Sequence, residues 1–240
     1  MVTVDESGQV SFARAQWKTS EYDLQAIQAA ENLAGEGDEV VIITVGEGEV
    51  TAAKNHKDVL ARGGARMVAV AFEGAREAET ASIACVLAAA IEREKPDMVF
   101  FGEGSSDRYC QTTGSYVAEL LGMPSANFVC GVALDGQTAT VKRDLEDGIQ
   151  TVQMSLPCAL SVATSINNPA LPSMKQILAA GKKPVEQIAL EDLGVTIEPK
   201  LEQQAVSAPP LPDRRGIALS GDVAEIAATL IESLRKDNVL

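Results

Sequence analysis

The residues best suited to chemistry in this sequence lie between positions 97 and 124, and the chemistry they suit is the binding of an anion. A short apolar run at 98–101 predicts a buried parallel strand, and a helical pattern ends near Gly122. The turn between them has two glycines, two serines and an aspartate: Gly102, Gly104, Ser105, Ser106 and Asp107. The first N–H groups of a helix have no partner within it, so this arrangement predicts a phosphate-type site. An ordinary strand-to-helix connection capped by Asp107 is the open alternative.

Residues for acid–base, nucleophilic or metal chemistry are sparse. The only histidine, His56, has lysines on both sides, and we interpret it as a solvated helix residue. The four cysteines are widely separated and form no CxxC pair, which argues against a zinc site or a redox dithiol. Glu146 and Asp147 adjoin a predicted hairpin turn, where carboxylates are usually solvated. We assign no catalytic and no metal-binding residue and do not expect an enzyme.

Composition narrows the fold and the partners. The chain has 240 residues, of which 46% are hydrophobic and only 4% aromatic, so its core must be built from Ala, Val, Ile and Leu. Parallel sheets covered by helices have such cores. The net charge of −14 argues against nucleic acid as a partner. No apolar run approaches the roughly 20 residues of a membrane span, and the first residues lack a signal-peptide pattern. We expect no membrane insertion and a reduced, cytoplasmic location.

The first half of the chain alternates strand and helix patterns. Strands are predicted at 40–45, 67–72 and 98–101. Helices are predicted from an N-cap at Ser20, over 50–62 and over 79–93. This alternation indicates an α/β fold with a doubly wound parallel sheet.

The second half has a different pattern. Short strands at 127–134, 138–143 and 149–156 with tight turns predict an antiparallel extension, followed by a strand at 159–163 and a helix at 173–180. We divide the chain into an α/β domain at 1–197, a proline-bearing linker at 198–215 and a C-terminal strand–helix arm at 216–240. The arm is expected to have a strand at 217–219 and a helix at 222–235. The alternative makes this pair the last sheet element of the same domain.

The opening of the chain does not fit the alternation. Residues 1–18 predict only a weak hairpin, although the helix after Ser20 should follow a buried strand that is usually central in such a sheet. Either the hairpin substitutes for that strand, or the strand belongs to sequence upstream of Met1.

Residues 141–165, VKRDLEDGIQTVQMSLPCALSVATS, resemble the signature segment of the electron transfer flavoprotein beta subunit. The matching positions are Val141, Arg143, Glu146, Asp147, Gly148, Gln150, Val152 and Pro157, and Ala159 departs from the usual larger aliphatic residue. Further segments resemble the Fix-type branch of that family: SEYDLQAIQAA near residue 20, GEGSSD and QTTG at 102–114, and NNPALPSMKQILAAGKKP at 167–184. The resemblance covers nearly the whole chain.

The resemblance implies a fold like that of the adenine nucleotide alpha hydrolases and a function in electron transfer. It implies a heterodimer whose alpha subunit carries the redox-active FAD, while the beta subunit holds AMP or a second FAD. Redox partners of the acyl-CoA dehydrogenase or quinone-reductase type are also implied. In this family an opening strand and loop precede the point at which the present sequence begins, which implies that the true start lies upstream.

Carried over by position, the resemblance implies a set of nucleotide-binding residues: Ser20, Glu21, Tyr22, Asp23, Val45, Gly102, Gly104, Ser105, Ser106, Asp107, Gln111, Thr112 and Thr113. Asp107 would cap a helix or bond a ribose hydroxyl, and the last three would offer donors to phosphate. Leu171 matches a loop residue that anchors partner dehydrogenases. Alternatively, Leu171 is a loop leucine that packs into the chain's own core.

Two rival functions belong to other classes. A stand-alone adenine-nucleotide sensor could share the fold, but the linker and arm favour a partner surface. A nucleotide-dependent ligase or hydrolase should carry a GxxxxGK[ST] loop, and the sequence has none.

Overall fold

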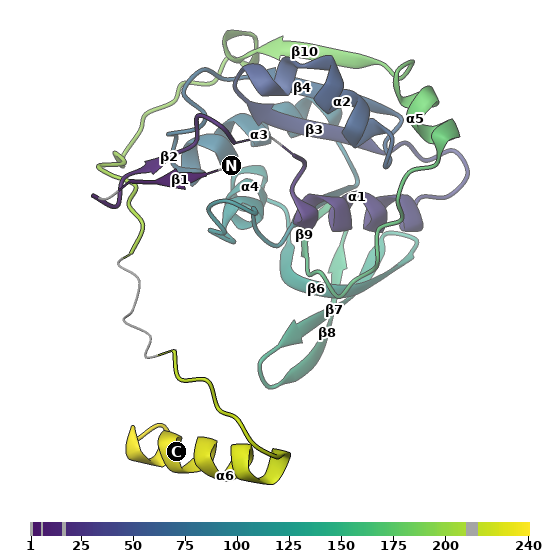
Figure 1. Ribbon diagram of the computed structural model, residues 1–240. Helices are drawn as coiled ribbons and strands as arrows, with labels where there is room; N and C mark the ends of the chain where they lie inside the picture. The colour runs from purple at the N-terminus through teal and green to yellow at the C-terminus, as the bar shows by residue number, and fades with distance from the viewer. Residues whose placement is uncertain (1, 6, 16–17, 210–215) are drawn as a thin grey trace. The chain divides into compact units, whose positions relative to one another are not determined.

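The structure is a computed structural model that describes residues 2–5, 7–15, 18–209 and 216–240. These residues fall into two units. The larger spans residues 16–204, and the smaller combines Met1–Ala15 with Ala205–Leu240. Figure 1 shows the elements of each unit.

One sheet of the larger unit is entirely parallel. Its order is β10 (Val185–Ala189), β4 (Arg66–Ala71) and β3 (Val41–Gly46). The central strand β4 buries Met67, Val68, Ala69 and Val70 almost completely, as expected for an apolar run with neighbours on both sides.

The second sheet mixes parallel and antiparallel strands. Its order is β5 (Met98–Gly102), β9 (Cys158–Val162), β6 (Ser125–Asp135), β7 (Thr138–Leu145) and β8 (Gly148–Ser155). The first three strands are parallel, and β6, β7 and β8 are antiparallel. The antiparallel extension predicted after residue 124 is therefore confirmed.

Helices cover both sheets. They are α1 (Glu21–Leu33), α2 (Ala53–Leu60), α3 (Thr80–Glu94), α4 (Thr113–Leu121) and α5 (Met174–Ala180), with short 3-10 turns at η1 (Gly48–Thr51) and η2 (Leu190–Leu193). Helix α3 packs on both sheets, because one apolar cluster joins its residues to Ile43 of β3 and to Val99 and Phe101 of β5. The predicted α/β class with parallel strands is confirmed. The strands form two sheets, however, since β3 and β5 are not paired with each other.

Three local features differ from the sequence predictions. The helix expected over 50–62 is split into η1 and α2. Strand β10 was not predicted, because its VEQIA sequence has polar residues in the middle, as an edge strand allows. His56 is not solvated: it is only 7% exposed, and its Nε2 bonds the carbonyl of Val50.

The smaller unit contains a hairpin and one helix. Strands β1 (Thr3–Val4) and β2 (Val10–Ser11) pair antiparallel, and Gln9 bridges to Ser207. Helix α6 (Val223–Lys236) begins with a reciprocal capping box between Asp222 and Glu225. The strand predicted at 217–219 does not form, and part of the predicted linker, 210–215, lies outside the described residues. Among the described helices, none is long and apolar enough to cross a membrane.

Candidate functional site

A cleft of about 1230 Å³ in the larger unit lies between β3 and β5 and follows both strands from residues 37–40 and 95–97 at their amino ends to residues 46–47 and 102–105 at their carboxyl ends. Ligands of α/β proteins bind at the carboxyl ends of the strands. Most of the residues singled out in the sequence line the cleft: Ser20, Asp23, Val45, Gly102, Gly104, Ser105, Asp107, Gln111, Thr112 and Thr113. Glu21, Tyr22 and Ser106 do not line it. The Ser106 hydroxyl instead lies 3.3 Å from that of Ser20.

The start of α1 is held against the end of β5. A Cβ on Gly102 would lie 2.7 Å from the Cβ of Tyr22 and 2.9 Å from the backbone nitrogen of Asp23. Only glycine allows the two backbones to approach this closely. Gly102 therefore lets the first turn of α1 lie against the end of β5, beside the cleft.

Asp23 lies in that first turn and opens onto the cleft. Desolvation by the surrounding protein raises the pKa of its carboxyl to about 6; a backbone hydrogen bond from Gly102 opposes the rise, and the charge of Asp107 adds to it. The side chain thus accepts a hydrogen bond while facing the open space. It is placed to accept another from a hydroxyl group in the cleft.

The turn after β5 is organised by its own side chains. The Ser105 hydroxyl accepts the N–H groups of Arg108 and Tyr109, each at 3.2 Å. Desolvation would raise the pKa of Asp107, but hydrogen bonds from the Ser105 hydroxyl and the Arg108 N–H outweigh it and lower the pKa. Asp107 is not a helix cap, because α4 begins at Thr113 and its N-cap is Thr112. The interpretation of Asp107 as a cap is therefore wrong.

Arg108 anchors this turn to another part of the chain. Its guanidinium donates to the carbonyl of Ala78 at 2.7 Å and to the carbonyl of Arg76. No sequence pattern indicates this contact, because the acceptors are backbone atoms about thirty residues away. The turn is therefore held by hydrogen bonds within itself and by the bonds of Arg108 to residues 76 and 78.

Two residues of the turn hold unusual backbone conformations. Tyr109 and Gln111 have φ values of 46° and 56°, in the left-handed region that non-glycine residues rarely adopt. The Tyr109 ring lies 5.2 Å from that of Tyr22, and its hydroxyl donates to Glu103 at 3.1 Å. Such strain is concentrated at binding sites, where the surrounding structure maintains it.

Helix α4 presents its N-terminus to the cleft without a side-chain cap. Its N-cap Thr112 makes no side-chain capping hydrogen bond. A Cβ on Gly114, in the first turn, would lie 3.1 Å from the Phe101 ring, so glycine lets the helix start close to β5. Open backbone N–H groups and the helix dipole favour an anion at this point. Among the described residues, no group of His, Cys, Asp and Glu side chains could hold a metal ion.

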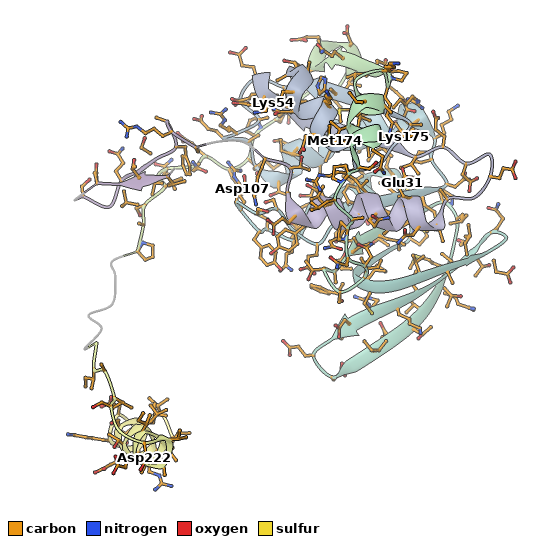
Figure 2. All side chains as sticks on the ribbon, turned by 45° about the vertical axis from the view of Figure 1, so that its right-hand side comes forward. Glu31, Lys54, Asp107, Met174, Lys175 and Asp222 are labelled. Atoms are coloured by element: carbon orange, nitrogen blue, oxygen red, sulfur yellow. The ribbon has the colours of Figure 1, made fainter. Side chains whose placement is uncertain are left out.

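A second candidate surface lies on the loop before α5. Leu171 is 85% exposed, so its alternative interpretation as a core residue is wrong. Met174 and Leu178 on α5 are 72% and 66% exposed. We call Leu171, Met174 and Leu178 the apolar strip. Figure 2 labels Met174 together with its neighbour Lys175, and Asp107 on the turn.

The parallel strands, the cleft at their carboxyl ends and the uncapped helix start define an α/β protein suited to a phosphate-bearing ligand. The model of the electron transfer flavoprotein domain matches residues 8–193. The chain belongs to the electron transfer flavoprotein family. Members of this family are electron-transfer proteins whose function involves a flavin.

Proposed function

We propose that this chain is the beta subunit of an electron transfer flavoprotein of the Fix-type branch. It pairs with an alpha subunit that carries the redox-active FAD, and it holds AMP or a second FAD in its own cleft. The heterodimer shuttles electrons between dehydrogenases or reductases and an acceptor. The proposal rests chiefly on one observation: the start of α1, the end of β3 and the turn into α4 border a single cleft.

The residues present fit a nucleotide. The uncapped first turn of α4, with Gln111, Thr112 and Thr113, supplies donors for phosphate oxygens. Asp23 and Asp107 supply carboxylate acceptors for ribose hydroxyls. A flavin, when bound in the heterodimer, supplies the electron-accepting group. This chain contributes the binding and orientation of its nucleotide and the surfaces that hold its partners.

Two exposed apolar surfaces suit such partners. The strip of Leu171, Met174 and Leu178 would anchor acyl-CoA dehydrogenase-type or quinone-reductase-type proteins, because exposed apolar side chains of this size bind well in a pocket. Helix α6 has an apolar stripe, Val223, Ile226, Ala227, Leu230, Ile231 and Leu234. Three of these residues, Val223, Leu230 and Ile231, are strongly exposed, so the stripe suits docking on the alpha subunit.

The test is to express the chain with the protein encoded beside it and to identify the nucleotides released on denaturation. We expect a yellow heterodimer with one flavin and one AMP, or with two flavins. In a Thr112→Val, Thr113→Val double variant, the nucleotide of this chain should fall at least about tenfold in affinity, because two hydroxyl donors are lost. Thr151→Val on β8, which does not line the cleft, should retain it. A colourless monomer without flavin would overturn the proposal.

A further inference from the structure

Helix α5 has one side in the core and another in contact with solvent. Ile177 and Ala180 belong to an apolar cluster that joins α5 to Leu60 of α2. Met174 and Leu178 are one turn apart on a different side of the helix and are strongly exposed. The packed side of α5 therefore fixes the position of the apolar strip on the larger unit.

The segment that carries the apolar strip differs in charge from the rest of the chain. The net charge of the chain is −14, yet residues 148–185 contain three lysines and no aspartate or glutamate. Two of these lysines, Lys175 and Lys182, are exposed. The third, Lys183, donates to two backbone carbonyls at 2.8 and 2.6 Å. Exposed positive charge thus lies beside exposed apolar side chains on an otherwise acidic protein.

Helix α2 adds two further exposed lysines beside α5. A Cβ on Gly181, at the end of α5, would lie 3.9 Å from Cε of Lys57, and Lys54 is one turn earlier on α2. Figure 2 labels Lys54 on α2 and Met174 and Lys175 on α5. We call the following four residues the basic border of the apolar strip: Lys54, Lys57, Lys175 and Lys182.

The lysines of the basic border form no ion pair with another described residue. Elsewhere in the larger unit, Arg66 is paired with both Glu39 and Glu94. The carboxylate of Asp58 on α2 instead accepts a hydrogen bond from the hydroxyl of Thr19 at 3.2 Å. The positive charges of the basic border are therefore available to the carboxylates of another molecule.

We propose that the basic border and the apolar strip together bind a protein whose docking face is an apolar pocket bordered by aspartate and glutamate side chains. This inference rests on the proposed function, in which the strip binds a redox partner, and it adds the charge of that partner. An acidic protein is repelled by the net charge of −14 and attracted locally by the basic border. The border thus orients the approaching partner and speeds association, whereas burial of the apolar strip slows dissociation.

An anionic lipid surface fits this face less well. Lysines beside apolar side chains also bind such surfaces. A chain with a net charge of −14, however, is repelled by anionic lipid wherever the basic border does not reach. A protein pocket of limited size contacts the border and the strip without this repulsion.

The test measures, by stopped flow at several salt concentrations, the association of the flavin-loaded heterodimer with a purified dehydrogenase- or reductase-type protein with which it exchanges electrons. In a Lys175→Glu, Lys182→Glu double variant, the association rate constant at low salt should fall at least about tenfold. The difference should vanish near 1 M salt, where the screening length is about 3 Å. The dissociation rate constant should change little.

Two controls separate local charge from other effects. Lys175→Arg with Lys182→Arg retains both charges and should retain the wild-type rates. Lys142→Glu changes an exposed lysine of β7, in the other sheet, and should have little effect on association. Lys54 is left unchanged because it also lines the cleft.

Four results would overturn the proposal. They are an association rate with the same salt dependence in the wild type and the double variant, an equal loss in Lys142→Glu, binding to vesicles of phosphatidylglycerol and phosphatidylcholine that the double variant loses, and a doubled mass that the double variant loses. Flavin content is measured for each variant. Full flavin content with unchanged association overturns this inference alone, whereas a colourless monomer overturns the proposed function on which it rests.

Discussion

Gly102 and Tyr22 approach so closely that a Cβ added to Gly102 would lie 2.6 Å from the carbonyl carbon of Tyr22. The contact joins the end of β5 to the first turn of α1. Gly102→Ala should therefore push the two elements apart and lower the free energy of unfolding by about 1–3 kcal/mol, the usual cost of overpacking. Gly48→Ala is the matched control, since a Cβ there meets nothing within 4 Å. Equal denaturation midpoints for the two variants would contradict this role of Gly102.

Gly104 is restricted by a side chain of the turn itself. A Cβ at this position would lie 2.5 Å from Cδ2 of Tyr109. Gly104→Val should displace the Tyr109 ring, disturb the turn and abolish retention of nucleotide. It should destabilise the fold less than Gly102→Ala, because the Tyr109 ring is partly exposed and can move. Nucleotide content after purification, measured beside the melting temperature, checks this, and an unchanged content would contradict it.

Asp23 and Asp107 should affect the pH dependence of stability in opposite directions. The pKa of Asp23 is raised from 3.8 to about 6 in the folded chain. The folded state therefore holds this proton more tightly, so the contribution of Asp23 to stability falls as the pH rises through that range. Relative to Asp23→Asn, the wild-type chain should lose stability between about pH 4 and pH 6.

The pKa of Asp107 is lowered, so its stabilising contribution is present above its ordinary pKa and is lost as the pH falls. Relative to Asp107→Asn, the wild-type chain should gain stability as the pH rises from acid values. Urea denaturation of the three proteins from pH 3 to pH 8 measures both differences. If the stability of each variant follows the same pH dependence as that of the wild-type chain, neither pKa shift contributes to stability.

Leu171 should matter to a redox partner and not to the fold. Because it is highly exposed, Leu171→Ala should leave the melting temperature and flavin content unchanged. Electron transfer to a partner dehydrogenase should fall about tenfold to a hundredfold, the effect of truncating an apolar anchor. Leu201→Ala, at a leucine that is 73% exposed outside this loop, is the control and should have no effect.

Helix α6 should contribute to holding the alpha subunit. Leu230→Asp places a charge in its apolar stripe and should weaken the heterodimer, while Glu232→Gln, outside the stripe, should not. Removal of residues 216–240 should leave the unit of residues 16–204 folded but without its partner at micromolar concentration. Co-purification and analytical ultracentrifugation measure the association. A heterodimer that survives the removal unchanged would argue against docking by α6.

Local patterns in the sequence determined much of the fold. Apolar β-branched runs gave β3, β4 and β5, glycine and aspartate turns gave the β6–β7–β8 extension, and periodic apolar residues gave α1, α3 and α6. These features depend on near neighbours in the chain, so their signals are strong. The same local pattern led to the wrong prediction that His56 is solvated. The neighbouring lysines carry no information about the hydrogen bond between His56 and the carbonyl of Val50.

Only the tertiary structure decided the features that depend on distant residues. The sequence did not indicate that β10 would add to β4, since a polar edge strand is stabilised by a neighbour more than a hundred residues away. The anchoring of Arg108 on the carbonyls of Arg76 and Ala78 has the same origin. The break in the strand–helix alternation before α1 was visible in the sequence. The open edges of β3 and β5 appeared only in three dimensions, because pairing between strands depends on which segments the fold brings side by side.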